Sequence, residues 1–327
     1  MEQRPLPRLD RQVSVIGLGT WQLGADWGEV PEDDARAVLG AAADAGVTFF
    51  DTADVYGDGR SEQVIGAFLR DRPDLDVLVA TKMGRRVALD PALYTLESFR
   101  AWTDRSRRNL GVDRLDLVQL HCPPTPVYSS DVVFDALDTL VEEQRIAGYG
   151  VSVETCDEAL TAIARPGVAS VQIILNPFRL KPLERVLPAA AEAGVGIIAR
   201  VPLASGLLSG RYTADTTFAA DDHRTYNRHG EAFDQGETFS GVDFRTGVEA
   251  AAELAALAPA GATPAQTALR WILQQPGVTT VIPGARNPEQ ARANAAAADL
   301  APLPQTTLDA VRELYDTRIR PQVHDRW

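Results

Sequence analysis

Apolar runs alternate with segments of helical periodicity from one end of the 327-residue chain to the other. Eight of these runs are strand candidates, and several are apolar at every position, which is typical of parallel strands covered on both faces. The candidate strands are residues 13–18, 47–50, 77–81, 115–120, 149–153, 170–175, 195–201 and 278–282.

Helix signals fill the intervals between these runs. Residues 130–147 carry an apolar stripe of the kind that packs a helix on a sheet, and residues 245–259 and 305–318 form two further helix patterns. The capping-box pattern, which marks the start of a helix, occurs in Thr155 with Glu158, Thr263 with Gln266, and Asn287 with Gln290. The glycines expected to end a helix just before a strand are Gly46, Gly111, Gly148 and Gly194.

Eight strand–helix repeats without a linker predict a single-domain (β/α)8 barrel, a TIM barrel, over residues 1–327. The alternative, a doubly wound sheet, usually carries GxGxxG after its first strand. Here Gly17 and Gly19 are followed by Gln22 in place of the third glycine, which disfavours that alternative. A long connection, residues 204–244, follows the seventh strand; loops of this length are usually functional or disordered. The pattern 305–318 predicts an extra helix at the C-terminus.

Four polar residues stand at or just beyond the ends of three successive strand candidates. Asp51 follows the run 47–50, Lys82 and His121 end the next two runs, and Tyr56 lies in the connection after Asp51. Neighbouring strands are about 4.8 Å apart, and barrels carry their chemistry at the carboxyl ends of the strands. Each residue alone has an ordinary structural explanation, but their joint occurrence predicts one shared pocket.

The chemistry of this set is that of a proton donor. A phenol has a pKa of about 10, and a neighbouring ammonium lowers it. Lys82 would act in this way on Tyr56, Asp51 would keep Lys82 charged, and His121 would hydrogen-bond the substrate oxygen. The result is general-acid catalysis toward a carbonyl. Because no side chain supplies a hydride, a nicotinamide cofactor is implied.

Composition narrows the class of protein. The formal net charge is −13 and the sequence pI is about 4.8, which disfavours nucleic acids and anionic membranes as partners. Cys122 and Cys156 are too few for a disulfide scaffold, and His223 and His229 lack the framework of a metal site, so we expect no metal. With no apolar leader and no run of 18 apolar residues, the sequence predicts a cytoplasmic protein that acts on a small molecule.

The segment around Asp51 resembles the signature of the aldo-keto reductase family. The matching residues are GVTFFDTADVYG at 46–57, with further matches in LGVDRLDLVQLH at 110–121 and VIPGARNPEQ at 281–290. The resemblance extends from residue 9 to about residue 300. It implies a (β/α)8 barrel, reversible reduction of aldehydes and ketones, NADP(H) as the usual cofactor, and a catalytic tetrad of Asp51, Tyr56, Lys82 and His121.

The resemblance also implies how the nicotinamide end of the cofactor and the substrate are bound. Ser152 and Gln172 would hydrogen-bond the carboxamide, for which an amide needs both a donor and an acceptor. The residues expected to border the nicotinamide are Gly19, Thr20, Trp21 and Asp51, and those expected to line the substrate pocket are Trp21, Trp27, Tyr56 and His121.

For the rest of the dinucleotide, the resemblance implies two segments. The first would wrap the pyrophosphate through backbone N–H groups and an arginine, and its residues are Arg200, Pro202, Leu203, Ser205, Leu207 and Arg211. The second starts a helix, whose N-terminus favours a phosphate, and its residues for the 2′-phosphate and adenine are Gly284, Arg286, Gln290 and Asn294. Arg224 in the long connection is a further candidate.

Three positions depart from the family pattern. Val153 replaces an Asn that many members have beside the serine, which puts one carboxamide contact in doubt. Arg200 replaces an aromatic residue that stacks on the nicotinamide; a guanidinium can also stack, but beside cationic NADP+ it would disfavour the oxidised form. Gly284-Ala285 replaces Lys followed by Ser or Thr, which weakens the case for strict NADP preference. NADP(H) remains favoured over NAD(H).

Two alternatives stay open at this stage. The chain would serve as a redox-sensing module if it held NADP(H) tightly without turnover, as potassium-channel beta subunits that resemble this family are thought to do. It would instead be a dedicated keto-sugar reductase or aldose dehydrogenase if the connection 204–244 selects such substrates. The sequence leaves open the physiological substrate, the direction of the reaction, and whether the protein is a monomer or a homo-oligomer.

Overall fold

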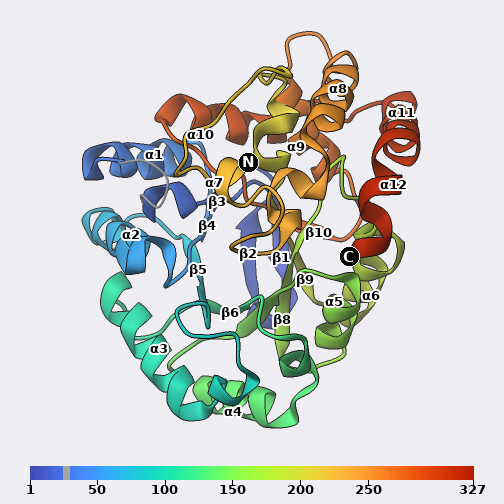
Figure 1. The fold of residues 1–327 in the computed structure, drawn as a ribbon. Helices are drawn as coiled ribbons and strands as arrows, with labels where there is room; N and C mark the ends of the chain where they lie inside the picture. Colours follow the sequence, from blue (N-terminus) through green and yellow to red (C-terminus); the bar gives the residue numbers. More distant parts are fainter. Residues whose placement is uncertain (25–29) are drawn as a thin grey trace.

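A computed structural model of the chain describes residues 1–24 and 30–327. Eight parallel strands form one sheet in the order β10-β9-β8-β7-β6-β5-β4-β3. Parallel bridges from Ile16 to Val281 and from Gly19 to Gly284 join the two edges, so the sheet closes on itself. Helices surround the strands (Figure 1), and the predicted (β/α)8 barrel is confirmed.

The barrel strands are β3 (Leu18–Gly19), β4 (Phe49–Asp51), β5 (Leu78–Met83), β6 (Leu117–His121), β7 (Tyr149–Ser152), β8 (Val168–Ile174), β9 (Gly196–Arg200) and β10 (Val278–Val281). The helices that follow them are α1 (Glu32–Asp44), α2 (Arg60–Asp71), α3 (Leu96–Leu110), α4 (Asp131–Glu142), α5 (Cys156–Ile163), α6 (Pro182–Ala193), α9 (Pro264–Leu273) and α10 (Pro288–Ala295). The connection after β9 holds α7 (His223–Tyr226), and outside the repeats lie α8 (Phe244–Ala255), α11 (Gln305–Leu314) and α12 (Arg320–Val323). Every residue of β4 to β10 is buried, which explains why these strands are apolar without alternation.

The helix starts follow local side-chain chemistry. Complete capping boxes begin α5 at Thr155 and α9 at Thr263, as predicted. At α10, Asn287 caps the backbone N–H of Gln290, but the Gln290 side chain accepts from the N–H of Arg286. The capping box predicted there is therefore only half formed, and Gln290 instead fixes the backbone just before the helix.

The predicted glycines end a helix at three of the four positions and do not at the fourth. Gly111 and Gly194 are left-handed C-caps of α3 and α6, and Gly46, with φ 86°, lies one residue beyond the C-cap of α1. Gly148 caps no helix, because α4 already ends at Glu142. A Cβ on Gly148 would lie 2.3 Å from the Leu9 side chain, so this glycine instead gives space to the N-terminal segment.

The N-terminal segment differs most from the prediction. The expected first strand, 13–18, is divided between β2 (Arg11–Ser14) and the short barrel strand β3. β2 pairs antiparallel with β1 (Gln3–Leu6), and this hairpin lies against the central barrel (Figure 1). Leu6 and Val13 are fully buried among side chains of the barrel interior. The hairpin thus fills the interior at the end opposite the carboxyl ends of the strands.

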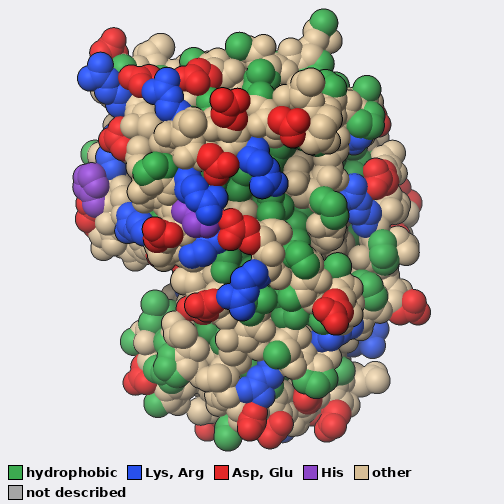
Figure 2. Space-filling model, turned by 90° about the vertical axis from the view of Figure 1, so that its right-hand side faces the viewer, with side chains coloured by type: hydrophobic (Ala, Val, Ile, Leu, Met, Phe, Trp, Pro, Cys, Tyr) green, Lys and Arg blue, Asp and Glu red, His purple; other side chains and the backbone are tan. Residues whose placement is uncertain are grey.

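The described helices are short, and charges of both signs share one face of the molecule. None of the helices within residues 1–24 and 30–327 is long and apolar enough to span a membrane. On the face that Figure 2 shows, acidic and basic side chains are interspersed. That face therefore has no continuous basic surface of the kind that tracks a phosphate backbone.

Candidate active site

The four residues from the strand ends lie together at the carboxyl end of the barrel. Asp51 ends β4, Lys82 lies in β5 and His121 ends β6. The Lys82 Nζ is 2.5 Å from Asp51 Oδ1, 2.8 Å from the carbonyl oxygen of Thr52 and 3.4 Å from the Tyr56 Oη. The rings of Tyr56 and His121 meet edge to face with their centroids 5.9 Å apart. A hydroxyl, an ammonium and an imidazole therefore share one small region.

The turn that carries Tyr56, η3 (Tyr56–Gly59), has an unusual backbone. Gly57, Asp58 and Gly59 have φ of 58°, 50° and 96°, a left-handed path that glycine adopts most easily. A Cβ on Gly57 would lie 2.1 Å from the carbonyl oxygen of Gly24. Arg105 of α3 donates to the carbonyl oxygen of Asp54, just before the turn, and to that of Asp58, within it. The turn is thus fixed by tight packing on one side and by hydrogen bonds on the other.

Burial is the largest single influence on the pKa values of Tyr56, Lys82 and His121. Burial raises the pKa of Tyr56 above its ordinary value, and Lys82 opposes this rise only in part. Burial lowers the pKa of Lys82, but Asp51 and Tyr56 raise it more, so the ammonium is retained. Burial, followed by the cations Arg85 and Lys82, lowers the pKa of His121 well below its ordinary value. The expected fall in the Tyr56 pKa is therefore outweighed by desolvation, and the phenol keeps its proton at neutral pH.

A cavity of about 670 Å³ begins at Tyr56 and His121 and extends to α10. The predicted residues that line it are Gly19, Thr20, Trp21, Asp51, Tyr56, His121, Ser152, Gln172, Arg200, Pro202, Leu203, Ser205, Arg211, Gly284, Arg286, Gln290 and Asn294. Lys82 lies beneath the cavity floor with 1% exposure, and the Leu207 side chain packs in the core. Trp27 lies outside the described residues.

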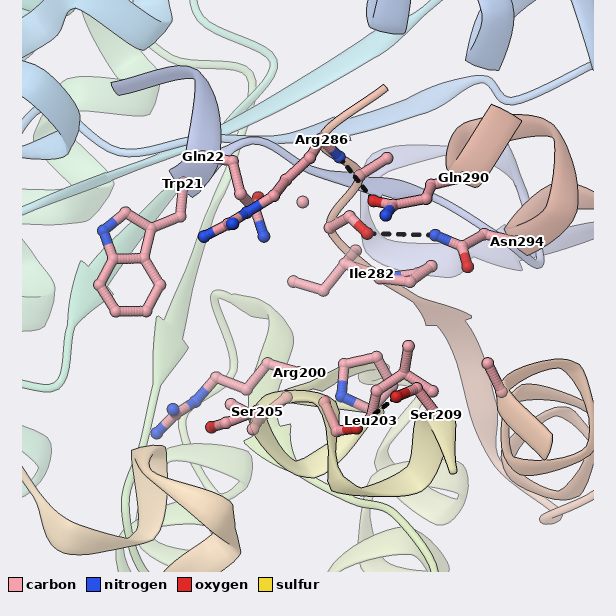
Figure 3. A pocket seen from close by; sticks show the side chains of 18 of the residues that line it. Trp21, Gln22, Arg200, Leu203, Ser205, Ser209, Ile282, Arg286, Gln290 and Asn294 are labelled. Carbon is pink, nitrogen blue, oxygen red and sulfur yellow. Dashed lines mark hydrogen bonds between the residues drawn. The ribbon is translucent and has the colours of Figure 1, made fainter. Parts of the chain in front are cut away.

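The cavity is a groove between two walls (Figure 3). One wall follows β9 and the turn η6 (Ala204–Ser209), with Leu203, Ser205 and Ser209. The other follows β10 and α10, where Asn294 Nδ2 donates to the Gly284 carbonyl oxygen at 3.1 Å. Arg286 is exposed on this second wall. Two walls of backbone groups and cationic side chains suit an extended, negatively charged ligand.

Arg200 lines the cavity, but its guanidinium group is ion-paired with two glutamates. Its Nη2 lies 2.8 Å from Glu154 Oε2, and its Nη1 lies 3.7 Å from Glu237 Oε1. Arg85 Nη2 contacts the same two carboxyl groups at 3.3 and 2.9 Å. We call Arg85, Glu154, Arg200 and Glu237 the charge cluster. Because its two guanidinium groups face two carboxyl groups, the repulsion expected between Arg200 and an oxidised nicotinamide is largely offset.

The two carboxyl groups of the charge cluster have pKa values shifted in opposite directions. Burial, with the neighbouring Glu237, holds the pKa of Glu154 above its ordinary value. Burial also acts on Glu237, but Arg85 and Arg200 outweigh it and hold its pKa below the ordinary value. Sequence reasoning missed Arg85, Glu154 and Glu237. Arg85 lies two positions after β5 and Glu154 two positions after β7, and a charged residue at such a place was the available signal for these two.

The structure also shows where Arg224, a further cofactor candidate, and the histidines His223 and His229 lie. Arg224 lines the cavity, but it is ion-paired with Asp222, and its guanidinium carbon lies 4.3 Å from the centre of the Phe218 ring. His223 is buried whereas His229 is exposed, so the two do not share an environment. Within the described chain, Cys122, Glu154 and Glu237 bring ligand atoms within 4.8 Å of one another, but the guanidinium groups of the charge cluster already contact both carboxylates.

Sequence reasoning also missed Gln22 and Gln119. Gln22 lines the cavity, and its amide nitrogen lies 2.1 Å from where a Cβ on Gly284 would be. The Gln22 amide can occupy this position because residue 284 is a glycine and has no Cβ. Gln119 is fully buried in the barrel, and its Nε2 donates to Asp51 Oδ2 at 3.2 Å. Its position two residues before His121 means that both side chains project from the same face of β6.

Comparison with known proteins identifies the family of the chain. The model of the aldo/keto reductase family matches residues 15–316, and the chain belongs to this family. It is 36% identical over 297 residues to the uncharacterized oxidoreductase Rv2298 of Mycobacterium tuberculosis, covering 88% of this chain and 85% of that protein. It is 29% identical over 315 residues to the aldo-keto reductase yakc [NADP(+)] of Schizosaccharomyces pombe, covering 93% and 89%.

Solved structures agree with the fold. The holo form of the aldo-keto reductase AKR11C1 from Bacillus halodurans superposes with a TM-score of 0.79 at 26% identity, covering 99% of both chains. An aldo/keto reductase from Klebsiella pneumoniae, in complex with NADP and acetate, gives a TM-score of 0.69 at 25% identity, covering 96% of both chains. The protein is thus an oxidoreductase of the aldo/keto reductase family, and its relatives bind NADP(H).

Proposed function

We propose that this protein reduces an aldehyde or ketone to the alcohol, reversibly, with NADP(H), and that Tyr56 is the general acid. The observation that carries the proposal is the Lys82 Nζ, 2.5 Å from Asp51 Oδ1 and 3.4 Å from the Tyr56 Oη, at the floor of the cavity. A phenol that keeps its proton at neutral pH is suited to donate it to a carbonyl oxygen. The ammonium beside it stabilises the phenolate left behind.

Each member of the tetrad has a separate task. Tyr56 transfers its proton to the carbonyl oxygen as negative charge develops there. His121, neutral because burial and nearby cations lower its pKa, donates an N–H to the same oxygen and orients the substrate. Asp51 holds the Lys82 ammonium, and Lys82 stabilises the phenolate and supports its reprotonation. In the reverse direction the phenolate accepts the proton of an alcohol.

The residues along the groove fit a nicotinamide dinucleotide, which supplies the hydride when bound. Gln172 offers an amide to the carboxamide, and Ser152 stands beside it on β7. Arg211 and Arg286 are exposed cations on the cavity wall, and the N-terminus of α10 favours a phosphate. Relatives named or described with NADP support NADP(H) over NAD(H). The remaining proposed contacts are Gly19, Thr20, Trp21, Arg200, Pro202, Leu203, Ser205, Gly284, Gln290 and Asn294.

One observation favours a polar substrate within this function. Arg200 and Glu237 of the charge cluster line the same cavity as Tyr56 and His121. Hydroxyl groups of a substrate can accept from the guanidinium and donate to the carboxylate without breaking the ion pairs. A hydroxylated carbonyl compound, such as a small keto-sugar, is therefore the second candidate, and a complete tetrad disfavours a module that only senses redox state.

The test is a panel of aldehydes, ketones and sugars scored by loss of NADPH absorbance, with NADH run beside it. We expect turnover with NADPH on an activated aromatic aldehyde and weaker turnover with NADH. Tight NADPH binding without consumption of any carbonyl compound would support the redox-sensing alternative and overturn the proposal.

A further inference from the structure

Asp51 is held by more groups than the tetrad alone provides. Its Oδ1 accepts from Lys82, and its Oδ2 accepts from Gln172 Nε2 at 2.7 Å and from Gln119 Nε2 at 3.2 Å. Gln172 Nε2 also donates to Gln119 Oε1 at 3.3 Å. Gln119 is fully buried, and Gln172 and Asp51 are each 2% exposed. The three side chains form a closed hydrogen-bonded triangle inside the barrel, and two of them, Asp51 and Gln172, line the cavity.

This triangle fixes which way the Gln172 amide faces. An ionised carboxylate only accepts hydrogen bonds, so the nitrogen of each amide must point to Asp51. Both N–H groups of Gln172 are then engaged, one by Asp51 and the other by Gln119. The Gln172 Oε1 is left without a donor among the described residues, and Gln172 lines the cavity. An acceptor is therefore presented to whatever binds there.

We infer that Gln119 is a positioning residue, which engages the second N–H of Gln172 and so keeps its Oε1 turned toward the NH2 of the nicotinamide carboxamide. The inference rests on the proposed NADP(H) dependence. Without Gln119, Gln172 has one N–H unsatisfied and more freedom to rotate its amide. Selectivity for a carboxamide-bearing cofactor would then fall, and Asp51 would lose one of its three donors.

The experiment compares NADPH with its 3-acetylpyridine analogue, which carries a methyl ketone in place of the amide and has no N–H to donate. Dissociation constants are measured by quenching of tryptophan fluorescence in the wild type and in Gln119→Met, which keeps the length of the side chain without its hydrogen bonds. We expect the wild type to prefer NADPH by roughly 3- to 10-fold, the effect of one neutral hydrogen bond. In Gln119→Met this preference should shrink toward unity.

Ser170→Ala is the matched control, because Ser170 is fully buried on β8, the strand of Gln172, and its hydroxyl has no hydrogen-bond partner. It should keep the preference of the wild type. If Gln119→Met does not fold, as judged by thermal melting, Gln119→Asn tests the same point with an amide that is too short. An unchanged preference in a folded Gln119 variant overturns the inference alone. No preference in the wild type overturns it as well, whereas no binding of NADPH to the wild type overturns the proposed function.

Discussion

Burial at the carboxyl end of the barrel shifts the pKa values of Tyr56, Lys82 and His121, and the neighbouring charges oppose or reinforce that shift. Lys82 keeps its proton because Asp51 and Tyr56 together outweigh desolvation. His121 loses its proton because burial lowers its pKa and the nearest charges, which are cations, lower it further. The sequence identified these residues from their place at strand ends, but the balance between desolvation and pairing depends on depth, which no sequence pattern reports.

Asp54 is a buried carboxyl group that the proposed reaction does not use. It is 1% exposed, and neither oxygen has a hydrogen-bond partner. Burial, reinforced by Glu62, raises its pKa from 3.8 to about 7. Because the pKa in the folded state lies above that of the unfolded chain, the folded state binds more protons between pH 4 and 7, and its stability falls as the pH rises through this range.

We therefore predict that Asp54→Asn stabilises the protein at pH 8, by about 1–3 kcal/mol after allowing for the cost of an unpartnered amide. At pH 4 most of the gain should vanish, because the carboxyl group is then protonated in the folded state and nearly half protonated in the unfolded chain, where its pKa is 3.8. Urea unfolding at the two pH values measures the difference. A gain of equal size at both pH values would show that ionisation of Asp54 is not its cause.

At the scale of elements, strands place Asp51, Lys82 and His121, and a connection places Tyr56. The strand ends were visible as apolar runs, and the capping boxes of α5 and α9 were read correctly from four-residue patterns. The turn that holds Tyr56 depends on contacts with Gly24 and Arg105, which come from distant parts of the chain. Short-range patterns could not reveal these contacts.

Gly57→Ala should disturb this turn. The added Cβ would meet the Gly24 carbonyl oxygen at 2.1 Å, so the backbone must move and carry Tyr56 with it. We expect turnover to fall by about 10- to 100-fold, since a displacement near 1 Å is enough for such a loss. Gly194→Ala is the control, because Gly194 has a φ of 67° with nothing within 4 Å.

The control should lose about 1–2 kcal/mol of stability from the left-handed backbone and keep its kcat/KM. Urea unfolding of both variants measures the cost of backbone strain, and steady-state kinetics measures the effect of moving Tyr56. Equal losses of kcat/KM in the two variants would contradict the role assigned to the Gly57 contact.

At the scale of the whole molecule, the barrel was predictable because one strand–helix pattern recurs along the chain. The N-terminal hairpin was not, because its strands have only four residues each and its pairing replaces part of an apolar run. The charge cluster was also missed, because residues 85, 154, 200 and 237 come together only when the barrel closes. These contacts exist only in the closed barrel, so local sequence patterns do not reveal them.

The hairpin should contribute to stability and not to chemistry. Leu6 is fully buried in the barrel interior, at the end away from the tetrad. We expect Leu6→Ala to lower the free energy of unfolding by about 2–5 kcal/mol, and the exposed Leu89→Ala to change it by less than about 0.5 kcal/mol. Both variants should keep the wild-type kcat at a temperature where they are folded. A large fall in the kcat of folded Leu6→Ala would show that the hairpin also shapes the active site.

The most direct measurement is a single turnover of Tyr56→Phe, with enzyme-bound NADPH mixed with a reactive aldehyde and followed by loss of NADPH absorbance. Phenylalanine keeps the ring that packs on His121 and removes only the hydroxyl 3.4 Å from the Lys82 Nζ. The account predicts unchanged NADPH affinity and a rate of NADPH loss lower by ~10²–10⁴-fold, the usual effect of removing a positioned general acid. A wild-type rate in this variant would contradict it.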